Sequence, residues 1–182
     1  MNLSKRVVEQ LEQLAGKGPK HIDAVILNSA QQQGYIVGVP TEAKEPSAAL
    51  TMEGYDRYSV TLRQLEVTCD HLPRSESKDE AYLRRCVEQV VRRLTYLEEP
   101  LALLELDPAT KLAQLRSQPP YQDGQKLTYW EVLIWATPYP RAKLTRYGWQ
   151  ADGQGREQIV YPATFATLGR IAQDLALSLI EA

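Results

Sequence analysis

The sequence has few of the side chains that most often carry chemistry. It contains only two cysteines and two histidines among its 182 residues. Cys69 and Cys86 have neither metal-ligand nor redox spacing, so we expect two buried, reduced thiols. No set of ligands falls at a known metal spacing either. We therefore predict no metal and no cofactor, and we expect a non-catalytic protein, with an enzyme as the alternative.

Long apolar runs and an excess of one charge are also missing. No run approaches the ~20 apolar residues that cross a bilayer, and the first residues lack the apolar core of a secretory signal. The formal net charge is −2, from 21 basic and 23 acidic side chains, which speaks against a globally basic nucleic-acid binder. These features predict a cytoplasmic protein without a membrane span and disfavour nucleic acid as its partner.

Two short polar combinations are the nearest approach to a catalytic motif. Cys69, Asp70 and His71 would form an activated thiolate only if the imidazole lay within hydrogen-bonding reach of the sulfur. Glu98 and Glu99 form a carboxylate pair, but they fall at a predicted helix end, where solvent exposure explains them. Neither combination has the third, orienting group that catalysis requires, so neither predicts an activity.

The densest run of β-branched and aromatic residues, 126–136, predicts a central strand. Because side chains of a strand alternate between its faces, this strand presents large groups on both sides. One face would carry Trp130, Val132, Ile134 and Ala136, and the other Tyr129, Glu131, Leu133 and Trp135.

The next segment, Thr137–Pro140, contains two prolines and predicts a turn into a return strand. A four-residue loop sets Glu131 opposite Arg146, and such charge pairs stabilise a ladder by roughly 0.2–1 kcal/mol. A loop one residue longer would place Val132 opposite Arg146 and lose this pair, so we favour the shorter loop. Its register pairs Ala136 with Arg141, Leu133 with Leu144, Glu131 with Arg146 and Trp130 with Tyr147.

Hydrophobic periodicity assigns the rest of the chain. Leu3, Val7, Leu11 and Leu14 recur at helical spacing, and a second short helix is predicted over 20–33. Along the predicted strand over 58–69, the apolar residues switch from even-numbered to odd-numbered positions halfway along. This switch predicts a β-bulge near Arg63–Gln64. A hairpin is expected over 101–117, and long amphipathic helices over about 80–99 and after Pro162.

These elements predict an α+β fold. We expect an antiparallel meander of about five to six strands, two long amphipathic helices packed on one face, and an N-terminal helical pair. The chain would form a single domain over 1–182, with the helical pair at 1–34, a loop or linker at 35–55 and the sheet-and-helix core at 56–182.

One surface of this fold is a candidate binding site. Arginine, tyrosine and tryptophan are enriched at binding hot spots, and they gather around the predicted central hairpin. The candidate residues are Tyr129, Glu131, Leu133, Trp135, Tyr139, Arg141, Lys143, Leu144 and Arg146. The leading hypothesis is a binding or assembly factor whose open sheet face engages a protein segment or a second subunit. The alternative is a small-molecule pocket, or a small enzyme, between the sheet and its helices.

Overall fold

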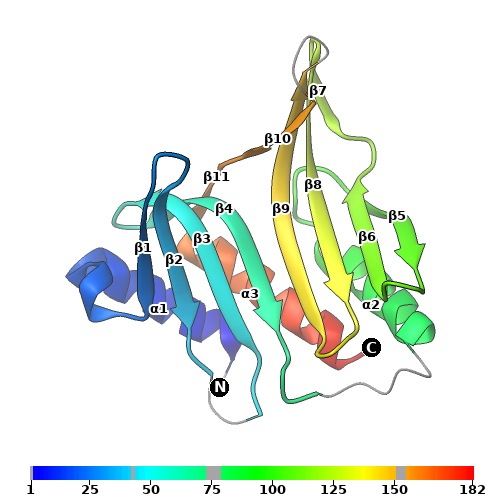
Figure 1. The fold of residues 1–182 in the computed structure, drawn as a ribbon, viewed down its shortest axis with the longest axis horizontal. Coiled ribbons are helices and arrows are strands. Elements are labelled where there is room, and N and C mark those ends of the chain that lie inside the picture. The colour runs from blue at the N-terminus through cyan, green and yellow to red at the C-terminus, as the bar shows by residue number, and fades with distance from the viewer. Residues whose placement is uncertain (1, 42–43, 73–78, 151–154) are drawn as a thin grey trace.

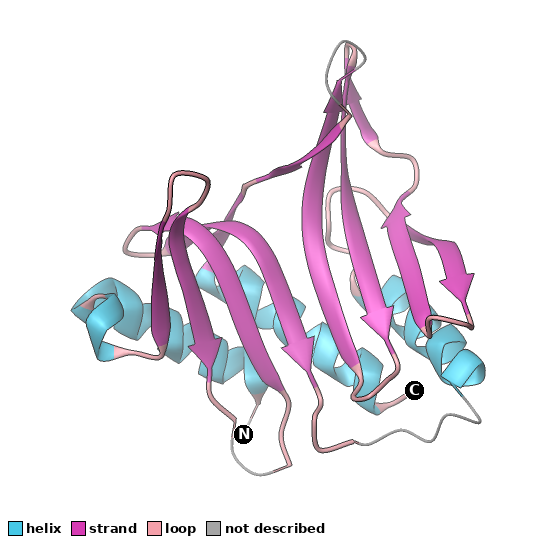
Figure 2. Ribbon diagram, viewed as in Figure 1, coloured by secondary structure: helices cyan, strands magenta, loops and turns pink. Residues whose placement is uncertain are grey.

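The computed structural model describes residues 2–41, 44–72, 79–150 and 155–182. Within these residues the chain forms two layers, an antiparallel sheet of 11 strands and three α-helices that lie on one face of it (Figure 1, Figure 2). None of the helices in this described part is both long and apolar enough to span a bilayer. The architecture is therefore α+β with an antiparallel sheet.

The first half of the chain is one helix followed by a four-stranded meander. Leu3, Val7, Leu11 and Leu14 form the buried stripe of the helix, and the Asn2 side chain caps it by accepting a hydrogen bond from the Ser4 amide. The elements are α1 (Leu3–Lys17), a short 3-10 turn η1 (Pro19–His21), β1 (Ala24–Asn28), β2 (Gln33–Val39), β3 (Ser47–Tyr55) and β4 (Ser59–Thr68).

The second half repeats this order of a helix and a meander. Its elements are α2 (Asp79–Arg93), β5 (Leu101–Asp107), β6 (Leu112–Ser117), β8 (Lys126–Trp135) and β9 (Arg141–Gln150). The short strand β7 (Tyr121–Asp123) pairs only with the start of β8. After β9 the chain forms β10 (Arg156–Ile159), β11 (Tyr161–Thr164) and the last helix, α3 (Phe165–Ile180).

The two meanders meet at their last strands. The order across the sheet is β1-β2-β3-β4-β9-β8-β6-β5, so β4 and β9 join the halves. β10 pairs with β9 and β11 with β4, and this segment crosses from the second half back to the first (Figure 1). The edges of the continuous sheet are β1 and β5. One cluster of buried apolar side chains from both halves and all three helices forms the core.

The expected five- or six-stranded meander with an N-terminal helical pair is wrong. The described chain has a single helix before the sheet, and its sheet has 11 strands. The segment over 20–33 forms η1 and β1, because a short apolar run such as 24–27 fits a strand as well as a helix. The segment over 35–55 is also not a linker, since β2 and β3 occupy most of it and bury Ala48, Leu50 and Met52.

Two local predictions are confirmed and one register is wrong. Opposite β3, the pairing of β4 skips Arg63, which is the predicted bulge. The hairpin over 101–117 forms as β5 and β6. Between β8 and β9, however, the loop has five residues, because Ala136 leaves the ladder and donates its amide hydrogen to the Lys111 carbonyl. The observed register is Trp135–Arg141, Val132–Leu144, Glu131–Thr145 and Trp130–Arg146.

Candidate functional site

The candidate site lies on the side of β8 and β9 that points away from the helices. Trp130, Val132 and Ile134 belong to the core under the sheet, so strand alternation turns the odd-numbered positions of β8 outward. Pairing adds the facing positions of β6 and β9. We call this surface the β8 face, and its residues are Leu112, Gln114, Arg116, Tyr129, Glu131, Leu133, Trp135, Arg141, Lys143, Thr145 and Tyr147.

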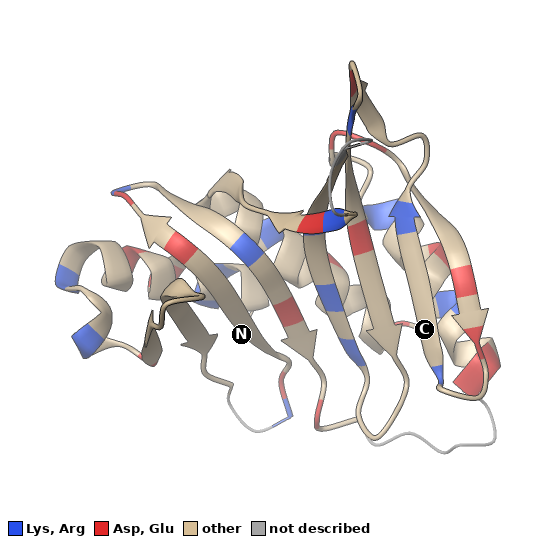
Figure 3. Cartoon of the chain, turned by 45° about the horizontal axis from the view of Figure 1, so that its top comes forward, with Lys and Arg blue, Asp and Glu red and all other residues tan. Residues whose placement is uncertain are grey.

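Trp135 forms the centre of a basic cluster on this face. The guanidinium carbon of Arg141 lies 4.3 Å from the ring centroid and the Lys143 Nζ atom 5.6 Å from it, both within the range of cation–π interactions. Among the described residues neither cation forms an ion pair, although Glu66 lies opposite Lys143 in the ladder. Basic positions of β9 are seen beside the acidic position of β8 in Figure 3. Two positive charges therefore remain available over an aromatic ring.

Glu131 has a different environment on the same face. It is only 2% exposed, although it points away from the helices. Its Oε2 atom accepts hydrogen bonds from Gln114 Nε2 at 2.5 Å, Arg116 NH2 at 3.2 Å and Arg156 NH1 at 2.8 Å. Two guanidinium groups thus compensate a carboxylate that is shielded from water, as a buried charge requires.

The side chains that cover Glu131 form an ordered stack. The Arg116 guanidinium lies 4.6 Å from the Tyr129 ring centroid, and that of Arg156 lies 4.3 Å from the Tyr147 centroid. The two tyrosine rings stack with centroids 5.9 Å apart. Burial, followed by the negative charge of Glu131, raises the pKa of Tyr147, so this phenol stays neutral. The stack gives the β8 face a rigid centre.

The structure brings together six of the nine predicted site residues. Tyr139 lies in the β8–β9 loop and is 44% exposed. Leu144 is fully buried in the core on the helix side, and Arg146 also points to that side, because the observed register shifts β9 by one residue. The six that share the β8 face are Tyr129, Glu131, Leu133, Trp135, Arg141 and Lys143.

Arg146 forms a buried ion pair under the sheet instead of the predicted pair with Glu131. Its NH1 and NH2 atoms donate to the two carboxylate oxygens of Glu99 at 3.1 and 2.9 Å, and NH2 also donates to Thr128 Oγ1 at 3.1 Å. The side chains of Arg146 and Glu99 are 11% and 6% exposed. Glu99 further accepts a hydrogen bond from Ser117 Oγ. This arrangement connects β9 to the segment after α2.

Glu98 joins the same group of side chains. It accepts a hydrogen bond from Trp130 Nε1 at 2.9 Å and another from the Tyr161 hydroxyl. Burial alone would raise the pKa of Glu98, but these two hydrogen bonds, a backbone hydrogen bond and the charge of Arg146 together hold the pKa below its ordinary value. Glu98 therefore stays ionised, and both Glu98 and Glu99 are bound by fixed donors, which is a structural role.

Sequence reasoning missed several residues of the β8 face. Gln114, Arg116 and Arg156 donate hydrogen bonds to Glu131, yet none was a candidate. The position of Arg116 beside Glu131 results from the pairing of β6 with β8. The alternation of side chains along β6 could have indicated that Arg116 lies on this face. Arg156 depends on the pairing of β10 with β9, and no local signal in the sequence fixes that pairing.

The Cys69 thiol of the Cys69-Asp70-His71 motif is not an activated thiolate. Cys69 is fully buried, and burial, the negative charge of Asp70 and the neighbouring Cys86 raise the pKa of its thiol to about 12. The thiol is thus the opposite of an activated nucleophile. Among the described residues no three His, Cys, Asp or Glu side chains lie close enough to hold a metal ion. Between the sheet and its helices, the described apolar side chains form one buried cluster.

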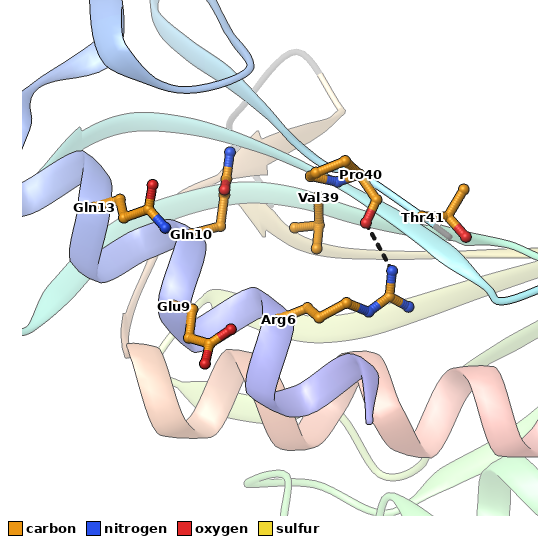
Figure 4. A pocket seen from close by; sticks show the side chains of 7 residues that line it. All are labelled: Arg6, Glu9, Gln10, Gln13, Val39, Pro40 and Thr41. Carbon is orange, nitrogen blue, oxygen red and sulfur yellow. Dashed lines mark hydrogen bonds between the residues drawn. The ribbon is translucent and has the colours of Figure 1, made fainter. Parts of the chain in front are cut away.

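A hollow of about 220 Å³ lies between α1 and the end of β2 (Figure 4). It is lined by Arg6, Glu9, Gln10 and Gln13 of α1 and by residues 39–41 at the end of β2. Arg6 donates to the carbonyl oxygens of Pro40 and Pro46 at 2.7 and 2.6 Å. Its guanidinium is thus used to hold the β2–β3 connection against α1, and we assign it a structural role.

Comparisons with known proteins give no relative: no family model matches the chain, and neither a search of curated proteins nor a search of solved structures found a match. The functional conclusion therefore depends on the geometry of the β8 face.

Proposed function

We propose that this protein is a non-catalytic binding protein that engages an acidic segment of a partner protein on its β8 face. The observation that carries the proposal is the pair of cations over Trp135. Arg141 and Lys143 have no ion-pair partner among the described residues, and the buried Arg141 Nε atom has no hydrogen-bond partner there. Trp and Arg are the residue types that most often dominate the energy of protein interfaces.

The surroundings of Trp135 favour binding without a large loss of entropy. Trp135 and Arg141 are directly opposite in the β8–β9 ladder, so both backbones are fixed before a partner arrives. The ring also restricts the guanidinium, which lies 4.3 Å from its centroid. A carboxylate of a partner would meet donors that are already in place, and such preorganisation reduces the cost of binding.

The composition of the face favours a protein segment over nucleic acid. Glu66 lies opposite Lys143 in the ladder, and the whole chain has a net charge of −2. A phosphate backbone carries one negative charge at every nucleotide, and the two cations over Trp135 are too few to follow it along the surface. A segment that combines carboxylates with apolar side chains fits both the cations and the half-buried Leu133 and Trp135.

A direct test uses a fluorescein-labelled peptide of alternating glutamate and leucine residues as the probe. We expect the wild-type protein to increase its fluorescence anisotropy at low salt, and Trp135→Ala to weaken binding by at least 30-fold, the equivalent of about 2 kcal/mol. Trp149→Ala is the matched control, because Trp149 is an exposed tryptophan at the far end of β9.

Two outcomes would contradict the proposed function. Equal loss of binding in Trp135→Ala and Trp149→Ala would show that the basic cluster does not select the peptide. Tighter binding of a single-stranded oligonucleotide than of the acidic peptide, with a steep dependence on salt, would assign the face to nucleic acid instead.

A further inference from the structure

The two edge strands of the sheet differ in how they are protected from pairing. β1 and β5 both lie at an edge, and no other strand of the described chain covers their outer sides. Both expose large apolar residues: Val25 and Ile26 are 57% and 53% exposed, and Leu103 and Leu104 are 40% and 53% exposed. An exposed edge is a template on which another strand can pair.

Strand β5 carries the usual protection of an edge. Its register against β6 is irregular between Leu103 and Glu105, so Leu104 is an extra residue in the strand. Glu105 and Asp107 add two negative charges to it. A bulge and charged side chains are both means by which native sheets prevent pairing at an edge.

Strand β1 has none of this protection. Its five residues, Ala24–Asn28, pair with β2 in one regular register and include neither a charged residue nor a proline. The Asp23 carbonyl accepts a hydrogen bond from the Gly38 amide, which places Asp23 at a hydrogen-bonded position of the ladder. Since such positions alternate in an antiparallel pair, Ala24, Ile26 and Asn28 direct their backbone groups outward. The Ala24 amide donates to the Ile22 carbonyl at 2.9 Å, so the outward groups open to a second strand are the Ala24 carbonyl and the backbone groups of Ile26 and Asn28.

We propose that β1 pairs with β1 of a second copy of this chain, antiparallel and centred on Ile26. A two-fold axis perpendicular to the sheet would set Ile26 opposite its symmetry mate and Ala24 opposite Asn28. The outward amides of Ile26 and Asn28 would then donate to the outward carbonyls of Ile26 and Ala24 in the other copy. Val25 then faces Leu27 on one side of the sheet, and the Ile26 pair lies on the other. No two like charges oppose each other, and the exposed apolar groups of β1 become buried.

The choice of a second copy rests on this self-complementarity. The strand is uncharged throughout, so it offers no charge pattern that would select a different partner. Its own sequence supplies an apolar match at every central position of the symmetric register. The dimer would be one continuous sheet with both β8 faces on the same side, but the pairing at β1 does not depend on what the β8 face binds.

The first test compares two edge variants of the full-length chain by light scattering and sedimentation over a range of concentrations. We expect the wild type to be a dimer. Ile26→Lys should weaken association by at least tenfold, because the symmetric register sets the two lysines opposite each other. Leu104→Lys is the matched control, since Leu104 is equally exposed at the other edge, and it should remain dimeric. Circular dichroism checks that both variants stay folded.

The second test reports on the register itself. Opposite residues of a hydrogen-bonded pair have Cα atoms about 5.5 Å apart, within the range of a disulfide. Ile26→Cys should therefore form a covalent dimer on mild oxidation, whereas Asn28→Cys should not, because Asn28 faces Ala24. A wild-type monomer at all concentrations, an unchanged dimer in Ile26→Lys, or equal crosslinking of both cysteine variants would overturn the proposal.

Discussion

At the scale of single residues, Arg146 shows how the position in a ladder determines an energetic role. An exposed pair with Glu131 would contribute only about 0–1 kcal/mol to stability. In the observed register Arg146 is opposite Trp130, not Glu131, so it lies on the helix side of the sheet. There it forms two hydrogen bonds with the buried carboxylate of Glu99. Its guanidinium also lies 4.9 Å from the Trp130 ring centroid. Removal of either Arg146 or Glu99 would leave the other as an unpaired buried charge.

We predict that Arg146→Ala lowers the free energy of unfolding by about 3–5 kcal/mol, because it leaves Glu99 buried and unpaired. Urea unfolding at neutral pH measures this change. The control is Arg84→Ala on α2, whose ion pair with Glu80 is solvent-exposed and should cost about 0.5 kcal/mol or less. A loss below 1 kcal/mol for Arg146→Ala would mean that the Arg146–Glu99 pair is open to water.

Cys69 gives a prediction about pH. Burial is the first cause that raises its thiol pKa from the ordinary value of 9.0 to about 12. Between pH 9 and 12 the unfolded chain therefore releases a proton that the folded chain retains, so the stability of the fold decreases as pH rises through this window. Tyr161, with its pKa raised from 10.0 to about 12 by burial and by its hydrogen bond to Glu98, acts in the same direction.

We expect the melting temperature of the wild type to fall more steeply between pH 9 and 12 than that of Cys69→Ala, which lacks the thiol. The comparison uses the slopes, because the alanine variant also loses packing in the core. Thermal scans over this pH range provide the measurement, and a thiol reagent at pH 8 should leave native Cys69 unmodified. Parallel slopes in the two proteins would show that the thiol is not shielded.

At the scale of elements, the contact between α1 and α3 depends on one glycine. A Cβ atom at Gly169 would lie 2.8 Å from both the carbonyl oxygen and the hydroxyl oxygen of Ser4. Gly16 in α1 has no atom within 4 Å of the same position. The two helices can therefore approach this closely only where α3 has no side chain.

We predict opposite effects of alanine at these two glycines. Gly169→Ala should destabilise the protein by about 1–3 kcal/mol, because α1 must move away from α3. Gly16→Ala should stabilise it by roughly 0.5–1 kcal/mol, because alanine has the higher helix propensity and meets no neighbour. Chemical unfolding of both variants provides the comparison, and a stabilising Gly169→Ala would show that α1 and α3 are not in close contact.

The elements also show which parts of the fold the sequence could predict. The stripe of α1, the amphipathic helix after Pro162, the bulge at Arg63 and the β5–β6 hairpin were all predicted, because each depends on local periodicity. The strand within the segment over 20–33 was not predicted, since the short apolar run of this segment fits either a helix or a strand. The β8–β9 register was wrong by one residue, because the Ala136–Lys111 hydrogen bond that shortens β8 joins segments that are separate in the sequence.

At the scale of the whole molecule, two helix-and-meander halves share one sheet through β4 and β9. The helices occupy one side of this sheet, so the other side is left for interactions (Figure 2). Four predicted site residues, Tyr129, Glu131, Leu133 and Trp135, lie on that side because strand alternation within β8 was correct. Arg141 and Lys143 lie there because of the observed register, which differs from the predicted one by one residue. Leu144 and Arg146 were placed there only by the wrong register, and Arg156 was missed because its position depends on β10.

The measurement that tests the role of the β8 face most directly is a reversal of its charge. Arg141→Glu combined with Lys143→Glu replaces the two cations over Trp135, and melting temperatures confirm that the variant is folded. We expect the wild type to bind the glutamate–leucine peptide and not a lysine–leucine peptide, and the variant to show the reverse preference, since charge complementarity selects the partner. Undiminished binding of the acidic peptide by the variant would contradict the proposed function.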